Sequence, residues 1–174
     1  EPFDVPAPWE GIYEDDPWEG ERLIWPPYAV GGVSRGHLSE AEARHLRANY
    51  GAKVSMIDQW FGRVLAALDD QGLWDSTAVV VCTDHGHYLG DVRGGDDLWG
   101  KPGVPQYEPL GHTPLLVHWP GAPGGGTCDA LTTSVDLHAT LAEVFGVEPR
   151  HRSHGRSLVP LLAGLMTLVA ASAR

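Results

Sequence analysis

The chain has 174 residues, of which 43% are hydrophobic and 20% are charged, and its formal net charge at pH 7 is −11. This composition is ordinary for a globular protein, and the length allows one sizeable core. The charge argues against a nucleic-acid partner, because phosphate binding needs clustered lysine and arginine. To bind an anionic substrate, the chain would need a local source of positive charge, such as a metal ion, a lysine or a helix N-terminus.

The first segment, residues 1–35, is rich in proline, glycine, tryptophan and acid, without a sustained hydrophobic period. We predict an ordered or semi-ordered loop whose tryptophans pack onto something else. Because the chain opens without an initiator methionine, we expect it to be a piece of a longer protein, and the sequence fixes neither compartment nor oligomeric state.

A long helix is predicted to follow, starting at Ser39 and stopping near Gly72. Ser39 and Glu42 have the spacing of a capping box, and glycine commonly ends a helix. Apolar residues recur along this segment at spacings of three and four, which indicates one buried stripe. The stripe consists of Leu46, Tyr50, Val54, Ile57, Phe61, Val64 and Leu68.

The segment TAVVVCTD, residues 77–84, is a short apolar run that suits a strand covered on both faces in a parallel sheet, with Cys82 as a buried thiol. The glycine-rich segment 86–111 is too long for a simple connector, and we expect it to be functional or disordered. A second buried strand is predicted over 113–121, and then a helix with Ser134 as its N-cap. This order of elements indicates an α/β sandwich.

An uncharged stretch at the C-terminal end covers residues 157–173 and falls just short of a membrane span. It also contains Pro160 and Gly164, which disfavour a continuous helix. We predict a docked terminal helix or a frayed tail, and no membrane span.

Residues suited to metal binding or catalysis lie where the first predicted strand ends. Ligands of open α/β sheets bind outside the carboxyl ends of the strands, so Asp84 and His85 are expected to face a crevice. A carboxylate beside an imidazole suits a divalent cation, although an isolated Asp-His pair is more simply a turn with a helix cap. Gly86 would let the backbone bring another group close. Lys101, one of two lysines, suits contact with a tetrahedral oxyanion or its leaving oxygen.

An ordered set of motifs resembles the sulfatases of the alkaline phosphatase superfamily. The set comprises TDHGHYLGD, LWGK and YEPLGHTPLLVHWPG, followed by TTSVDLHATLAEVFGV and HGRSLVPLLAG. The resemblance implies an α/β fold, an alkaline-phosphatase-like three-layer α/β/α sandwich, of which this chain holds the later half. Residues 36–164 would be the later part of the catalytic domain, 1–35 a loop segment and 165–174 a divergent tail.

Carried over by position, the resemblance implies that Asp84 and His85 are metal ligands and that Lys101 contacts the sulfate and stabilises the leaving group. His87 and His112 lie in matching loops and are expected near the substrate. The implied substrate is a sulfate ester, and the implied cofactor is a divalent metal ion, Ca²⁺ first, with Mn²⁺ or Zn²⁺ as alternatives. Structural roles are expected for Asp58, Asp136, His118 and His138.

The family's nucleophile is a formylglycine made from the Cys or Ser of a C/S-x-P-x-R motif, and neither Cys82 nor Cys128 stands in that setting. The family's early paired aspartates and P-H-x-P-F histidine are also absent. We therefore expect the formylglycine in a preceding segment and no sulfatase activity from the 174 residues alone. Two alternatives stay open: a fragment of a phosphodiesterase or phosphonate monoester hydrolase, and a non-enzymatic truncated module that acts through a partner chain.

Overall fold

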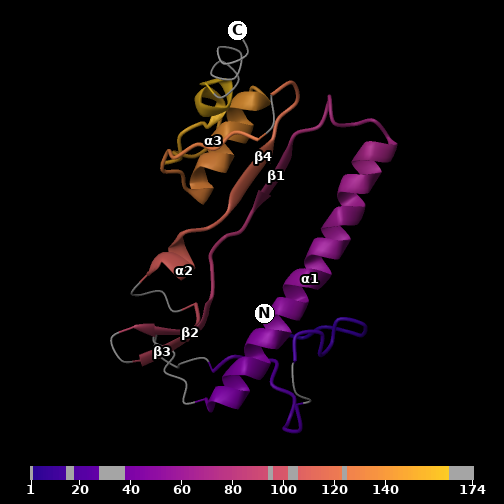
Figure 1. The fold of residues 1–174 in the computed structure, drawn as a ribbon. Helices are drawn as coiled ribbons and strands as arrows, with labels where there is room; N and C mark the ends of the chain where they lie inside the picture. The colour runs from indigo at the N-terminus through magenta and orange to yellow at the C-terminus, as the bar shows by residue number, and fades with distance from the viewer. Residues whose placement is uncertain are drawn as a thin grey trace. The chain divides into compact units, whose positions relative to one another are not determined.

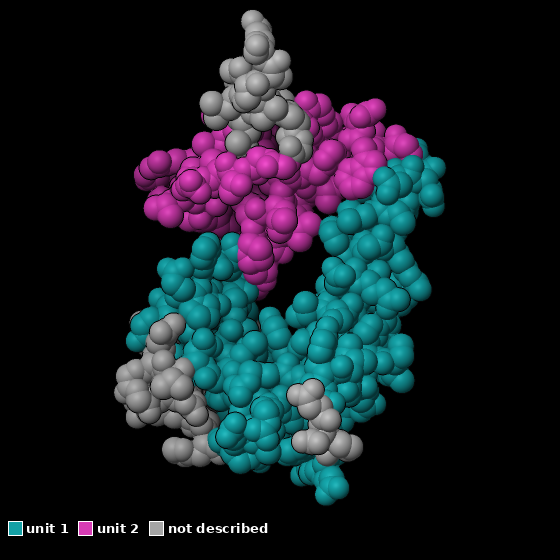
Figure 2. All heavy atoms as spheres, in the orientation of Figure 1, with its two compact units in different colours: residues 1–71, 85–113 teal, residues 72–84, 114–174 magenta. Residues whose placement is uncertain are grey.

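A computed structural model describes residues 2–14, 18–27, 38–93, 96–101, 106–122 and 125–164. The chain divides into two compact units, coloured separately in Figure 2. Unit 1 comprises Glu1–Gln71 and His85–Thr113, and unit 2 comprises Gly72–Asp84 and Pro114–Arg174. The boundary predicted near residue 35 and the tail predicted over 165–174 both lie outside the described residues.

Unit 1 is built on a long helix and a β-hairpin (Figure 1). Strands β2 and β3 pair antiparallel. The segment after Gly86, predicted to be functional or disordered, thus contains a hairpin and a short helix. The elements of unit 1 are α1 (Glu40–Asp70), β2 (Tyr88–Arg93), β3 (Asp96–Gly100) and α2 (Glu108–Gly111).

Helix α1 begins as predicted, at a capping box. The Ser39 hydroxyl accepts the Glu42 N–H at 3.2 Å, and the Glu42 carboxylate accepts the Ser39 N–H at 2.7 Å. The predicted apolar stripe is buried only in its first half: Leu46 is fully buried, whereas Val54 and Ile57 are 50% and 57% exposed. A stripe buried along the whole helix is therefore wrong, because the core of unit 1 packs on the first turns of α1 only.

The hairpin contacts α1 at a β-bulge. Gly90 occupies the bulge with a φ of +89°, and a Cβ there would lie 2.7 Å from Nη1 of Arg47 and 2.9 Å from the Trp99 ring. Arg47 donates to the carbonyl of Leu89 at 2.9 Å and sits 5.8 Å from the centroid of the Trp99 ring. Both the backbone and the close approach therefore require glycine at this position.

The N-terminal segment contributes to the core of unit 1. Phe3 is buried together with Leu46 of α1 and Trp99 of β3. The N–H of Phe3 donates to the carbonyl of Ile24 at 2.6 Å, which joins the two ends of this segment. Trp25, by contrast, is 55% exposed.

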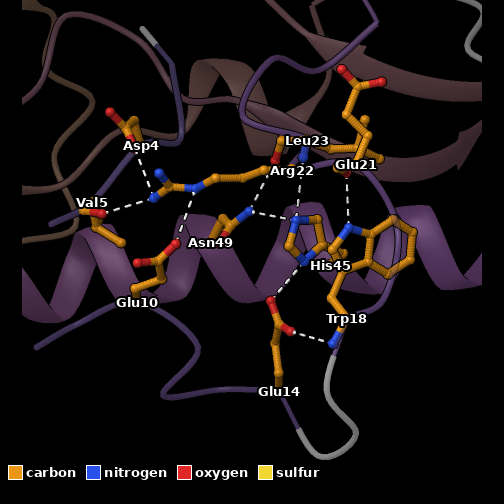
Figure 3. A network of polar contacts seen from close by, with 10 residues as sticks. All are labelled: Asp4, Val5, Glu10, Glu14, Trp18, Glu21, Arg22, Leu23, His45 and Asn49. Atoms are coloured by element: carbon orange, nitrogen blue, oxygen red, sulfur yellow. Dashed lines mark hydrogen bonds and ion pairs between the residues drawn. The ribbon is translucent and has the colours of Figure 1, made fainter. Parts of the chain in front are cut away.

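A buried histidine ties the same segment to α1 (Figure 3). The Nδ1–H of His45 donates to the Glu14 carboxylate at 2.6 Å, and its Nε2 accepts from the Leu23 N–H at 3.3 Å and the Asn49 amide at 3.1 Å. Two donors aimed at Nε2 place the proton of the neutral imidazole on Nδ1. Trp18 stacks on this ring with centroids 4.5 Å apart, as predicted for a tryptophan of the loop.

Two segments of unit 1 meet at Gly86. Its N–H donates to the carbonyl of Leu110 in α2 at 2.8 Å, and Leu110 is buried. A Cβ on Gly86 would lie 1.9 Å from the carbonyl oxygen of Pro109, a distance that real Cβ atoms do not adopt. The prediction that Gly86 brings another group close is confirmed.

Unit 2 contains an antiparallel strand pair and a helix (Figure 1). Strand β1 (Val79–Cys82) pairs with β4 (Leu115–His118) in opposite directions, and α3 spans Ser134–Val144. The prediction of a parallel sheet is wrong for this pair, because β1 and β4 are antiparallel. The prediction of burial on both faces is also wrong for β1, because its residues alternate between half-buried and exposed. Cys82 is likewise exposed rather than buried.

The C-terminal part of unit 2 docks through Leu158, which is buried, and is helical over residues 159–164. A docked terminal helix was one of the two predictions for this stretch, and its remaining residues lie outside the described part. Within the described ranges, no helix combines the length and the apolar character needed to cross a membrane.

Helix α3 is held by Asp136, whose capping role is confirmed. The N-cap is Thr133 rather than the predicted Ser134, because the Asp136 carboxylate accepts the N–H of Thr133 at 2.8 Å in a capping box. The same carboxylate accepts the N–H of Arg156 at 2.8 Å. These backbone hydrogen bonds, that of Arg156 first, hold the pKa of the Asp136 carboxyl below its usual range. Asp136 thereby fastens the segment after α3 to the start of the helix.

We predict that Thr140→Val destabilises unit 2 by about 1–3 kcal/mol, because a buried N–H loses its acceptor. The Thr140 hydroxyl donates to the carbonyl of Asp136 at 2.7 Å and accepts the N–H of Leu158 at 2.9 Å, and valine has the same shape without the hydroxyl. Urea unfolding followed by circular dichroism measures the loss. Thr140→Ser keeps both hydrogen bonds and serves as the matched control; equal stability of the two variants would contradict the prediction.

We predict that Gly86→Ala separates the segment after β1 from α2 and destabilises unit 1 by about 1–3 kcal/mol, as overpacking does. Gly111→Ala is the control, because a Cβ on Gly111 meets nothing within 4 Å. Thermal unfolding and amide hydrogen exchange at Gly86 and Leu110 report the change. Unaltered exchange at these two positions in Gly86→Ala would refute the close approach.

Candidate active site

His85 and Lys101 come together in unit 1. Nζ of Lys101, which directly follows β3, lies 3.2 Å from Nε2 of His85. Nδ1 of His85 lies 2.7 Å from the carbonyl oxygen of Gly86, which can only accept, so the imidazole proton sits on Nδ1. Nε2 therefore carries the lone pair and accepts a hydrogen bond from the ammonium group. The structure thus joins two of the residues predicted for the site.

Asp84 is the last residue of this part of unit 2 and is one peptide bond away from His85. Its carboxylate is exposed and accepts from the Thr83 hydroxyl at 3.4 Å. Each of these two side chains carries a donor of a type that divalent cations bind, an oxygen on Asp84 and a ring nitrogen on His85. Among the described residues, no group of three or more His, Cys, Asp or Glu side chains is placed to hold a metal ion. These two donors would therefore form only part of a coordination shell.

His87 packs inside unit 1. Its ring meets Phe3 edge-on with centroids 5.2 Å apart and lies 6.2 Å from the Tyr50 ring. Nδ1 is 2.8 Å from the carbonyl oxygen of Tyr88, and Nε2 is buried with no hydrogen-bond partner among the described residues. Burial lowers the pKa of His87, against the opposing effect of the hydrogen bond to Tyr88. Its contact with substrate stays a prediction.

His112 lies at the C-terminal end of α2 and is largely exposed. Its Nδ1 is 3.1 Å from a carboxylate oxygen of Glu108, an exposed pair four residues apart on one helix face. Such surface pairs contribute little to stability. Its predicted contact with substrate also stays a prediction.

The segment that carries Lys101 is anchored at both ends by residues that sequence reasoning missed. Tyr88, Leu98 and Leu110 form one buried cluster, which joins β2, β3 and α2. The Tyr88 hydroxyl also accepts the N–H of Tyr107 at 2.8 Å. These residues lie within the motifs TDHGHYLGD, LWGK and YEPLGHTPLLVHWPG, but the sequence assigns them no role. Their apolar character within a polar segment is the signal that points to burial.

Comparisons with known proteins identify relatives of this chain. The multifunctional alkaline phosphatase superfamily protein PehA of Trinickia caryophylli is 37% identical over 128 residues, which is 72% of this chain and 24% of PehA. A choline-sulfatase of Rhizobium meliloti (strain 1021) is 33% identical over 132 residues, which is 74% of this chain and 24% of that protein. The chain thus spans about a quarter of the length of these relatives.

Among solved structures, the phosphonate monoester hydrolase SpPMH from Silicibacter pomeroyi matches with a TM-score of 0.64 and 37% identity. The match covers 72% of this chain and 24% of that one, and it identifies the fold as part of an alkaline-phosphatase-like α/β fold. The sulfatase family model matches residues 2–147. This chain belongs to the sulfatase family of the alkaline phosphatase superfamily.

Proposed function

We propose that this chain carries metal-binding and leaving-group residues of a sulfatase active site, and that the reaction is the hydrolysis of a sulfate ester. The contact between Nζ of Lys101 and Nε2 of His85, at 3.2 Å, carries the proposal. It brings an ammonium group and an imidazole donor together from positions 16 residues apart. Both positions match motifs of the family to which the chain belongs.

Asp84 and His85 would hold the divalent metal ion. The hydrogen bond from Nδ1–H of His85 to the Gly86 carbonyl orients the ring and leaves Nε2 as the nitrogen with a lone pair, as metal coordination requires. Ca²⁺ is proposed first from the family, and the imidazole donor makes Mn²⁺ or Zn²⁺ the alternatives. When bound, the metal would act as a Lewis acid on the oxygens of the ester group.

Lys101 would stabilise negative charge on the reacting ester. Its ammonium group is exposed and accessible to an anionic ligand. Ester cleavage leaves negative charge on the departing oxygen, and a positioned cation lowers the energy of that charge more than it lowers that of the neutral ground-state oxygen. Without a metal ion, the lone pair on Nε2 of His85 accepts one ammonium proton. A bound ion would take that lone pair and leave the ammonium group to the ester. Lys101 is therefore the proposed leaving-group residue of this chain.

A second candidate is hydrolysis of a phosphate diester or a phosphonate monoester. The 37% identity and the TM-score of 0.64 to the Silicibacter pomeroyi phosphonate monoester hydrolase favour it. The same three residues would serve either chemistry, because both ester types carry tetrahedral oxyanions. Kinetic comparison of an aryl sulfate with an aryl phosphonate, in a protein that also contains the nucleophile, distinguishes the two candidates.

We predict that Asp84→Asn and His85→Gln each weaken Mn²⁺ binding by about tenfold or more, since each removes a direct ligand and even outer-shell changes cost about 10- to 100-fold. Calorimetry and the broadening of amide resonances near residue 85 by Mn²⁺ measure the affinity. Asp75→Asn removes the same charge from an exposed turn and should leave binding unchanged. Equal weakening in all three variants would show that only general charge attraction holds the ion.

We predict that the 174 residues alone do not turn over an aryl sulfate, because the sequence holds no C/S-x-P-x-R nucleophile motif. A chimera in which this chain replaces the matching quarter of the Rhizobium meliloti choline-sulfatase should be active. In that chimera Lys101→Ala should lower kcat by about 100- to 1000-fold, as does the loss of an oxyanion-stabilising group. Arg63→Gln on α1 is the charge-matched control; an equal kcat for Lys101→Ala and the control would reject the role of Lys101.

A further inference from the structure

Unit 2 contains a pocket whose lining includes neither Asp84 nor any residue of unit 1. Its volume is about 340 Å³, which lies within the range of small-ligand sites. One wall is formed by the start of α3, through Val135 and His138, and the other by the loop of residues 150–154. The pocket therefore belongs to one compact unit and is separate from the residues of the proposed active site.

The pocket is basic within an acidic chain. Arg150, Arg152 and three histidines line it, whereas no aspartate or glutamate does. The formal net charge of the chain is −11, yet no acidic residue occurs in the sequence after Glu148. Neither arginine makes a side-chain hydrogen bond or ion pair with another described residue. Two arginines that line a pocket with no aspartate or glutamate among its described lining residues favour an anion as its ligand.

The loop that carries these side chains is anchored to α3. The Asp136 carboxylate accepts the Arg156 N–H at 2.8 Å and so already has backbone partners. A Cβ on Gly155 would lie 2.1 Å from the carbonyl oxygen of Val135, so the backbone after the loop passes directly over the first turn of α3. The N–H of Gly155 donates to the Ser153 hydroxyl at 3.1 Å. The basic side chains thus extend from a loop with a fixed end, which reduces the entropy lost on binding.

We propose that this pocket binds a small organic anion with a sulfate or phosphate group, at a site additional to the proposed active site. Arg150 and Arg152 would donate to the oxyanion, and imidazole N–H groups of His151 and His154 would add donors. Val135, 51% exposed at the pocket wall, would contact the apolar body of the ligand. The pocket volume exceeds the needs of a bare tetrahedral ion and leaves room for that body.

Titration of the 174-residue chain with phenyl sulfate and phenyl phosphate, followed by amide NMR at neutral pH and constant low ionic strength, tests the proposal. We expect saturable shifts in residues 150–154 and in the first turns of α3. The double variant R150Q/R152Q should bind about tenfold more weakly or worse, the effect of losing charge-assisted hydrogen bonds. R44Q/R63Q removes the same charge from α1 and should bind as the unmodified chain does. Circular dichroism and thermal unfolding confirm that both double variants fold.

The variant Lys101→Ala distinguishes ligand binding in the unit 2 pocket from ligand binding at the proposed active site. Unchanged binding in that variant supports the pocket in unit 2, whereas loss of binding there with retention in R150Q/R152Q would overturn it. Equal weakening in R150Q/R152Q and R44Q/R63Q, or shifts that never saturate, would also overturn it. Inorganic phosphate and sulfate are the remaining probes: weaker binding than the phenyl esters supports an organic ligand, and equal binding would overturn that part of the proposal.

Discussion

The approach of Gly86 to α2 is the constraint on which the candidate active site depends. The hydrogen bond from its N–H to the Leu110 carbonyl, at 2.8 Å, forms only because no Cβ separates the two backbones. The same residue uses its carbonyl to accept the Nδ1–H of His85. One glycine therefore fixes both where the chain runs after β1 and which nitrogen of His85 carries the lone pair. The contact of His85 with Lys101 follows from that placement.

The rest of unit 1 shows which structural features depend on residues close in the sequence and which depend on distant residues. The capping box of Ser39 and Glu42 depends on residues three apart, and the sequence predicts it correctly. The Glu14 and His45 contact joins residues 31 positions apart, and no periodicity or motif marks it. Its stability comes from a complete set of partners for a buried imidazole, a condition that only the folded chain reveals. The pairing of β1 with β4 is equally non-local, and apolar content alone wrongly favoured a parallel partner.

The candidate site likewise combines features that the sequence predicts with features that only the structure shows. The sequence predicts Asp84, His85 and Lys101 as site residues, because their motifs stand in the order typical of the family, and these roles stay predictions. The tautomer of His85 and the anchoring of the Lys101 segment by Tyr88 and Leu110 could not be predicted, because they arise from contacts between backbones and buried side chains. The structure also explains Asp136: its carboxylate accepts the backbone N–H of Thr133 before α3 and that of Arg156 in the segment after it, which is a structural role.

A chain with a net charge of −11 can attract an anion only where positive charge is concentrated locally. Two such places among the described residues are built differently. Lys101 places a single compact positive charge next to donors suited to a metal ion. Such a charge can stabilise the negative charge that develops on a reacting ester. Arg150 and Arg152 line a pocket with no carboxylate among its described lining residues, and planar guanidinium groups suit hydrogen bonding to the oxygens of a bound anion. Under the two proposals, the first arrangement would serve catalysis and the second would serve binding.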